Sequence, residues 1–160
     1  MNSNRAFWFG RYEGWLRLLA HGVKDGDADC IRKAARLFDL MLPDVCVVIP
    51  MPSHNGRAEK MMDVAKAIPG RGRFRVAALF SEPHERSYDV KKDGLVPAPF
   101  KTWCDPALLR AAPEDAVRGG LFVIDNVLCT GATAGSALAA MDRAGRGPAR
   151  VCALAACSWR

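Results

Sequence analysis

Short apolar runs without polar alternation recur along this chain of 160 residues and restrict its fold more than any other feature. Such runs are typical of strands covered on both faces, as in a parallel sheet. The runs lie at 44–49 (DVCVVI), 75–80 (RVAALF), 121–124 (LFVI) and 150–156 (RVCALAA). One helical pattern, at 27–42, precedes the first run, and two others lie between later runs at 57–68 and 134–144. The alternation predicts an α/β fold with a mostly parallel sheet, flanking helices and right-handed crossovers.

The size of the chain suits one domain. With half of its residues apolar, a chain of this length supports one core and is short for two, so 1–160 is expected to be a single domain. No apolar run is long enough to span a membrane, and the first residues lack the charged-then-apolar order of a secretory signal. We therefore expect a cytoplasmic protein with no membrane partner.

Two segments depart from the strand-and-helix alternation. Residues 6–21 (AFWFGRYEGWLRLLAH) space apolar side chains at three, four and seven, which predicts an amphipathic helix, or a turn followed by one. Residues 81–102 are polar, contain proline and show no period. A loop of this length inside a compact domain is typically a lid or a disordered segment.

The six cysteines do not form a metal-binding pattern. There is no Cys-x-x-Cys pair and no histidine at ligand spacing, so reduced thiols and no zinc site are expected. Cys152 and Cys157 are the nearest pair in sequence, and an offset of five on a strand directs them to opposite faces.

The stretch LFVIDNVLCTGATAGS, residues 121–136, combines a strand, an acid, a small-residue turn and a helix start. Gly131 lets an anion approach backbone amides, Thr130 and Thr133 add hydroxyl donors, and the helix dipole favours a dianion. Asp125, placed at the end of the strand, can accept hydrogen bonds from sugar hydroxyls. The pattern suits a ribose 5-phosphate; the alternative is a capped helix with no ligand.

This stretch resembles the phosphoribosyl pyrophosphate (PRPP) motif of the type I phosphoribosyltransferases. The segments RYEGWLRLLAHGVKDGD, VCVVIPMPSHNGRAEK and SALAAMDRAGRGPARVCALAACS are similar in order and spacing to the ComF-like branch, named for bacterial competence proteins. The resemblance implies an α/β core at 44–160, a small helical hood at 1–43 over the carboxyl edge of the sheet, and a mobile loop at 81–104. The N-terminal zinc module of many ComF-like proteins is not expected here, because the sequence shows no paired cysteines.

The resemblance also implies roles for the residues of this motif. The 5-phosphate would be held by Cys129, Thr130, Gly131, Ala132 and Thr133. Asp125 would hold the ribose hydroxyls and act as the catalytic acidic residue, stabilising positive charge on the sugar ring. The second acid of the family pair is replaced by Asn126, which can bind a hydroxyl but adds no charge. Cys129 is expected to serve as a small residue and not as a nucleophile.

The loop after the first predicted core strand, PMPSHNG at 50–56, would bind pyrophosphate. The residues assigned to it are Met51, Ser53, Arg57 and Lys60. The two cations would neutralise the leaving group, or else they are solvated charges at a helix start. The family's arginine-glycine-aromatic run is replaced here by RAEKMM. Mg²⁺ is implied through PRPP, with few direct protein ligands.

Two functions follow from the resemblance. One is an enzyme that transfers phosphoribose from PRPP to a nitrogenous base with release of pyrophosphate. The other is a non-catalytic protein on the same fold that senses PRPP or a nucleotide, or serves DNA uptake and processing. The formal charge of +6 also allows direct nucleic-acid binding. The aromatic residues Phe7, Trp8, Phe9 and Trp15 suit either a hood core or a homodimer contact.

Overall fold

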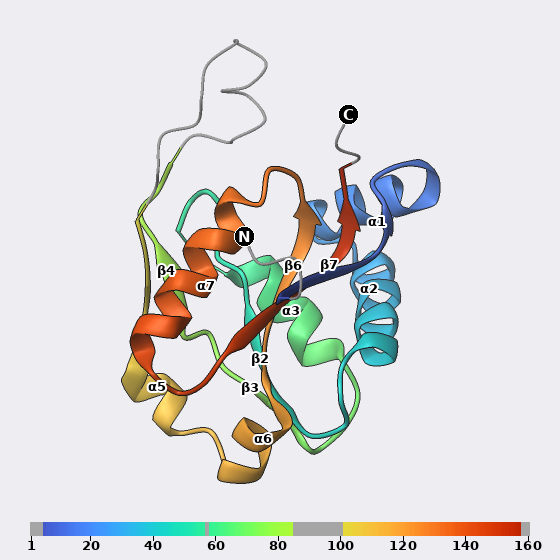
Figure 1. Ribbon diagram of the computed structural model, residues 1–160. Coiled ribbons are helices and arrows are strands. Elements are labelled where there is room, and N and C mark those ends of the chain that lie inside the picture. Colours follow the sequence, from blue (N-terminus) through green and yellow to red (C-terminus); the bar gives the residue numbers. More distant parts are fainter. Residues whose placement is uncertain (1–4, 57, 85–100, 158–160) are drawn as a thin grey trace.

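Five parallel strands form the central sheet of the computed structural model, which describes residues 5–56, 58–84 and 101–157 (Figure 1). In spatial order they are β1 (Ala6–Arg11), β7 (Ala149–Ala156), β6 (Leu121–Leu128), β2 (Cys46–Pro50) and β3 (Arg73–Arg75). All four pairings are parallel. The predicted α/β class, with a mostly parallel sheet flanked by helices in a single domain, is confirmed.

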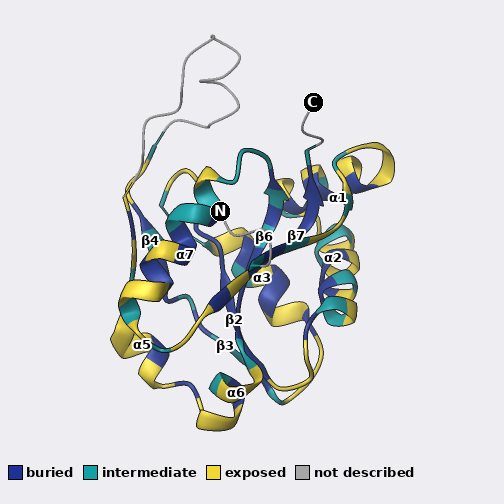
Figure 2. Ribbon diagram, viewed as in Figure 1, coloured by how far each residue is buried: buried dark blue, intermediate teal, exposed yellow. Residues whose placement is uncertain are grey.

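Helices cover both faces of the sheet. One face carries α1 (Gly14–Asp25), α2 (Ala28–Met41) and α3 (Glu59–Ala67), and the other carries α5 (Pro106–Arg110), α6 (Glu114–Gly119) and α7 (Ala132–Ala144). Successive strand residues point to opposite faces, so Phe122 and Ile124 pack toward α1–α3 while Leu121 and Val123 pack toward α7. Figure 2 shows the central strands β2, β6 and β7 largely buried between helices whose outer surfaces are exposed, whereas the edge strand β1 is partly exposed.

The helices follow from local sequence signals. The Asp27 side chain accepts a hydrogen bond from the amide of Cys30 at 2.7 Å and so caps the start of α2. Ala34, Ala35 and Phe38 then form its buried stripe at helical spacing. The turn between α1 and α2 contains Gly26, whose φ of 77° lies in the left-handed region.

The N-terminal prediction is wrong in its first part. Residues 6–11 form β1, which pairs with β7 at the sheet edge, and α1 begins only at Gly14. The spacing of Phe7 and Trp8 from Trp15, Leu18 and Leu19 fits a helix stripe, but aromatic residues are equally suited to a strand, and pairing with β7 decides between the two. α1 and α2 pack on one face of the sheet, with α1 contacting β6 and β7, and the hood role of residues 1–43 stays a prediction.

Two other boundaries also differ from expectation. The run RVAALF does not form one strand: β3 ends at Arg75, and β4 (Leu79–Ser81) leaves the sheet to pair antiparallel with β5 (Thr102–Cys104). These two short strands frame the predicted loop, whose residues 85–100 lie outside the described residues. The strand predicted at 121–124 continues to Leu128, and α5 and α6 are elements that the pattern did not indicate.

Gly119 is a point where the backbone of α6 touches the start of β2. A Cβ at Gly119 would lie 1.8 Å from the carbonyl oxygen of Val45, a backbone atom that cannot move aside cheaply. We expect Gly119→Ala to lower the free energy of unfolding by about 1–3 kcal/mol through overpacking. Gly135→Ala, in open space within α7, should raise it by about 0.5–1 kcal/mol. Urea denaturation of both variants measures this, and equal effects would contradict it.

Candidate functional site

The carboxyl ends of β2 and β6 mark a change of direction in the chain. After β2 the chain crosses to β3 through α3 on one face, whereas after β6 it crosses to β7 through α7 on the other. Ligands of open α/β sheets bind where neighbouring connections diverge in this way. The last β2–β6 pair is Pro50 with Ile124, and the amide of Met51 donates to the carbonyl of Ile124 at 2.9 Å. The loop predicted to hold pyrophosphate therefore begins beside Asp125, whereas the predicted phosphate loop begins further along, where β6 ends at Leu128.

Asp125 is the first residue of β6 beyond the end of its pairing with β2. It is not at a strand terminus as expected, because β6 continues beside β7 and Asp125 stands opposite Ala153. Asp125 is half-buried as a residue, and its carboxylate accepts a hydrogen bond from the amide of Asn126 at 2.7 Å. Burial raises the pKa of Asp125 to about 6, while that hydrogen bond and the charge of Lys24 lower it. At Asp125, strand β6 is thus paired with β7 but no longer with β2, and the pKa of the carboxyl is shifted toward neutral pH.

Lys24 is a residue that the motif analysis did not select. It lies in the last turn of α1, about a hundred positions before Asp125 in sequence, and its charge acts on both Asp125 and Cys129. No local pattern marks such a residue, since only the packing of α1 beside β6 brings its charge to this edge.

Asn126 points to the opposite face from Asp125. Its side-chain nitrogen donates to the carbonyl of Ala20 in α1 at 2.8 Å, and only 7% of the residue is exposed. The side-chain oxygen of Asn126, Oδ1, is buried and has no hydrogen-bond partner within the described residues. Asn126 therefore holds α1 against the carboxyl end of β6, and its predicted contact with a ligand hydroxyl remains a prediction.

The turn between β6 and α7 is short and contains the predicted phosphate loop. Gly131 occupies the N-cap with a φ of 75°, a left-handed conformation that favours glycine. Glycine has no side chain to cap the helix, which leaves the amides at the start of α7 to other acceptors. The amide of Ala132 bonds the hydroxyl of Thr130 at 3.2 Å, and Thr133 in the first turn is half-buried.

The loop after β2 forms a tight turn. The amide of Gly56 donates to the carbonyl of Ser53 at 2.9 Å, and the hydroxyl of Ser53 bonds the side chain of Asn55. Gly56 has a φ of 82°, and a Cβ there would lie 2.3 Å from the carbonyl oxygen of Ser81. The turn is therefore pressed against the end of β4.

The other residues predicted for pyrophosphate are placed differently. Met51 is 2% exposed and belongs to the core, and its amide already donates to the carbonyl of Ile124, so its contact with pyrophosphate stays a prediction. The ammonium nitrogen of Lys60 lies against the turn between α1 and α2, 2.7 Å from the position that a Cβ of Gly26 would take. Arg57 lies outside the described residues.

Cys129 and Cys157 are brought together at the ends of β6 and β7. The amide of Cys157 donates to the carbonyl of Leu128 at 3.0 Å. Burial raises the pKa of Cys129 to about 12, and a hydrogen bond with the Cys157 side chain adds to the effect. The high pKa disfavours the Cys129 thiolate near neutral pH and fits the expectation that Cys129 is not a catalytic nucleophile. The sequence does not predict the proximity of the two thiols, because Cys129 and Cys157 are far apart in sequence and only the pairing of β6 with β7 brings them together.

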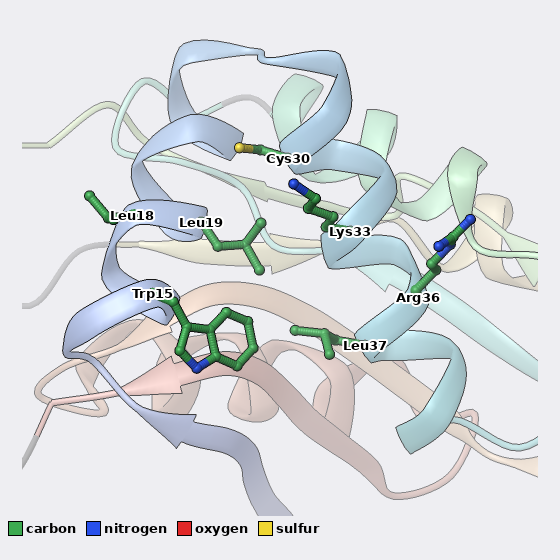
Figure 3. A pocket seen from close by; sticks show the side chains of 7 residues that line it. All are labelled: Trp15, Leu18, Leu19, Cys30, Lys33, Arg36 and Leu37. Atoms are coloured by element: carbon green, nitrogen blue, oxygen red, sulfur yellow. The ribbon is translucent and has the colours of Figure 1, made fainter.

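A groove of about 440 Å³ lies elsewhere, between α1 and α2 (Figure 3). Trp15, Leu18 and Leu19 from α1 form one wall, and Cys30, Lys33, Arg36 and Leu37 from α2 form the other. None of the residues predicted for ligand binding lines it. Lys33 is paired with Asp29 at 2.5 Å, so part of the positive charge at its rim is already compensated.

Comparisons with models of protein families, with curated proteins and with solved structures yield no match to this chain. Within residues 5–56, 58–84 and 101–157, no group of three or more histidine, cysteine or acidic side chains is arranged to hold a metal ion. Among the described helices, none is both long and apolar enough to cross a membrane.

Proposed function

We propose that this protein binds a ribose 5-phosphate ligand, above all PRPP, at the carboxyl ends of β2 and β6, and transfers phosphoribose to a nitrogenous base with release of pyrophosphate. One observation supports this most: Asp125, with its pKa raised to about 6, lies just past the end of the pairing between β6 and β2. It stands on the strand that leads into the glycine turn before α7. Shifted acids at such an edge are typical of functional sites.

The chemistry of the two neighbouring loops supports the proposal. A phosphate at the start of α7 would accept hydrogen bonds from backbone amides and gain from the helix dipole. Asp125, a few residues earlier on β6, would accept hydrogen bonds from ribose hydroxyls. Displacement of pyrophosphate builds positive charge on the sugar ring, and an ionised Asp125 would stabilise that charge.

A non-catalytic PRPP or nucleotide sensor is the second candidate, and Asn126 favours it. The resemblance to the type I phosphoribosyltransferases leads us to expect two acids at this place, yet the second position holds an amide that is engaged with Ala20 of α1. Binding of phosphate and ribose does not require a second carboxylate, whereas stabilisation of the transition state benefits from one.

Mg²⁺ is part of the proposal through the ligand. The ion would neutralise phosphate charge, keep most of its water and be supported by Asp125 as the nearby carboxylate. Burial raises the pKa of Asp125, and a cation beside this carboxyl would lower it again and favour the ionised form. Calorimetric titration of PRPP with and without Mg²⁺ tests the dependence.

Binding and turnover are separated by one pair of measurements. Purified protein is titrated with ribose 5-phosphate and with PRPP and Mg²⁺, and pyrophosphate release is then followed with a panel of purines, pyrimidines and related bases. Release with one base supports the transferase. Binding without release on any base supports the sensor, and absence of binding contradicts both.

The glycine turn before α7 provides a matched test of the phosphate site. Gly131→Ala should weaken ribose 5-phosphate binding by about tenfold or more, because strain at a φ of 75° displaces the amides that hold the phosphate. Gly145→Ala is the control, since Gly145 has a φ of 71° at the far end of the same helix. Both variants should lose about 1 kcal/mol of stability. Equal affinities in calorimetry would place the phosphate elsewhere.

A further inference from the structure

Cys129 and Cys157 follow the last paired residues of two neighbouring parallel strands. Leu128 on β6 stands opposite Ala156 on β7, and each cysteine is the next residue along its strand. Neighbouring strands lie roughly 4.8 Å apart. A disulfide accepts a Cα separation of about 4.4–6.8 Å, and two residues that keep the strand spacing beyond the pair Leu128 and Ala156 would fall in that range.

The two thiols also lie close enough to interact. Both thiols are free and both residues are half-buried, so a small oxidant can reach them. A hydrogen bond between the two side chains contributes to the raised pKa of Cys129. The other four cysteines, all in the described part of the chain, have no thiol among the groups that shift their pKa.

We infer that Cys129 and Cys157 form a reversible disulfide that ties the turn before α7 to the end of β7 and weakens ligand binding at that turn. The pairing stands on the strand register alone, whereas the effect on ligand binding rests on the proposed function.

The oxidant is a low-molecular-weight disulfide, and the reaction balances as two exchanges. The Cys157 thiolate attacks one sulfur of the oxidant, which forms a mixed disulfide and expels one small thiolate. That thiolate takes the proton of Cys129, whose sulfur attacks the Cys157 sulfur and expels the second small thiolate. The protein loses two electrons and two protons, and the oxidant gains them as two thiols.

Closure of the bond changes the turn. The S–S bond is about 2.0 Å long, shorter than any non-bonded contact between two thiols. Bond formation therefore draws Cys129 toward β7. Thr130 and Gly131 follow it directly, so the amides before α7 move relative to Asp125, which stays paired within β6.

Peptide mapping tests the pairing without any ligand. The protein is incubated with oxidised glutathione and digested with trypsin, and the linked peptides are fragmented by tandem mass spectrometry. We expect peptides 119–143 and 151–160 to be joined through Cys157, with the link absent after dithiothreitol. Peptide 151–160 also contains Cys152, so the fragment ions must assign the sulfur. A link through Cys152, or no link, overturns the inference.

Calorimetry tests the effect on the turn. Ribose 5-phosphate should bind the oxidised protein at least about tenfold more weakly than the reduced protein, with recovery on reduction. Cys157→Ala should be insensitive to the oxidant, whereas Cys104→Ala on β5 should respond like the unmodified chain. Equal affinity in a fully linked sample overturns the regulatory effect. A reduced protein that does not bind ribose 5-phosphate contradicts the proposed function and leaves the mapped disulfide standing.

Discussion

Asp125→Asn is expected to stabilise the folded protein near neutral pH by about 3 kcal/mol. The pKa of Asp125 is raised to about 6 in the folded state, against about 3.9 for an unperturbed aspartate. Each unit corresponds to about 1.4 kcal/mol, so ionisation of the buried carboxyl costs the folded state this amount. The amide variant carries no charge and can still accept the hydrogen bond from the amide of Asn126.

The pH dependence of this gain has a definite sign. Between about pH 4 and about pH 6 the folded state holds the proton of Asp125 and the unfolded state has lost it, so stability falls as pH rises through this window. The gain from Asp125→Asn should therefore be absent below about pH 4 and complete above about pH 6. Urea denaturation across this range measures it. Asp63→Asn, at an exposed site on α3, is the control and should show no such profile.

The same substitution should impair the proposed site. Hydrogen bonds to a charged group contribute about 1.5–3 kcal/mol, so ribose 5-phosphate should bind Asp125→Asn about 10–100-fold more weakly. Binding to the unmodified protein should strengthen as pH rises through about 6, because the ionised carboxylate is the stronger acceptor. A variant that gains stability and keeps full affinity would show that Asp125 is buried without a ligand role.

Arg73→Met is expected to lower the free energy of unfolding by about 3–5 kcal/mol, because it leaves several backbone carbonyls without their donor, each at a cost of about 1–3 kcal/mol. Arg73 is 3% exposed. Its guanidinium forms an ion pair with the carboxylate of Asp39 and donates to the carbonyls of Pro43 at 2.9 Å and Pro69 at 2.7 Å. It also donates to the carbonyl of Leu42 at 2.9 Å. The Arg73 side chain, at the start of β3, thus holds together the end of α2 and the segment that precedes β2.

Matched variants separate the role of shape from that of charge. Arg73→Lys keeps the charge but replaces the planar fork by a single ammonium, so it should recover only part of the stability. Arg32→Met removes an exposed arginine of α2 that pairs with Asp29 at 3.3 Å and should change stability by less than about 0.5 kcal/mol. Similar losses for Arg73→Met and Arg32→Met in urea denaturation would contradict this account.

The alternation of buried strands and amphipathic helices was sufficient to predict the fold class. β2 and β7 lie within a residue or two of their predicted limits because unbroken apolar runs suit only strands covered on both faces. α2 and α3 were also predicted closely, since caps and helical spacing are local signals. The motif at 121–136 likewise placed Asp125 and Gly131 before a helix, a local arrangement that the structure contains.

Other features depend on contacts between distant segments. β1 is a strand because β7 offers it hydrogen bonds, and β4 leaves the sheet because β5 pairs with it. Lys24 beside Asp125, Asn126 against Ala20 and Cys157 beside Cys129 have the same origin. Local sequence encodes period, caps and turns through interactions within a few residues. Partners across the sheet arise from packing that minimises exposed apolar surface over the whole chain, and no short pattern records them.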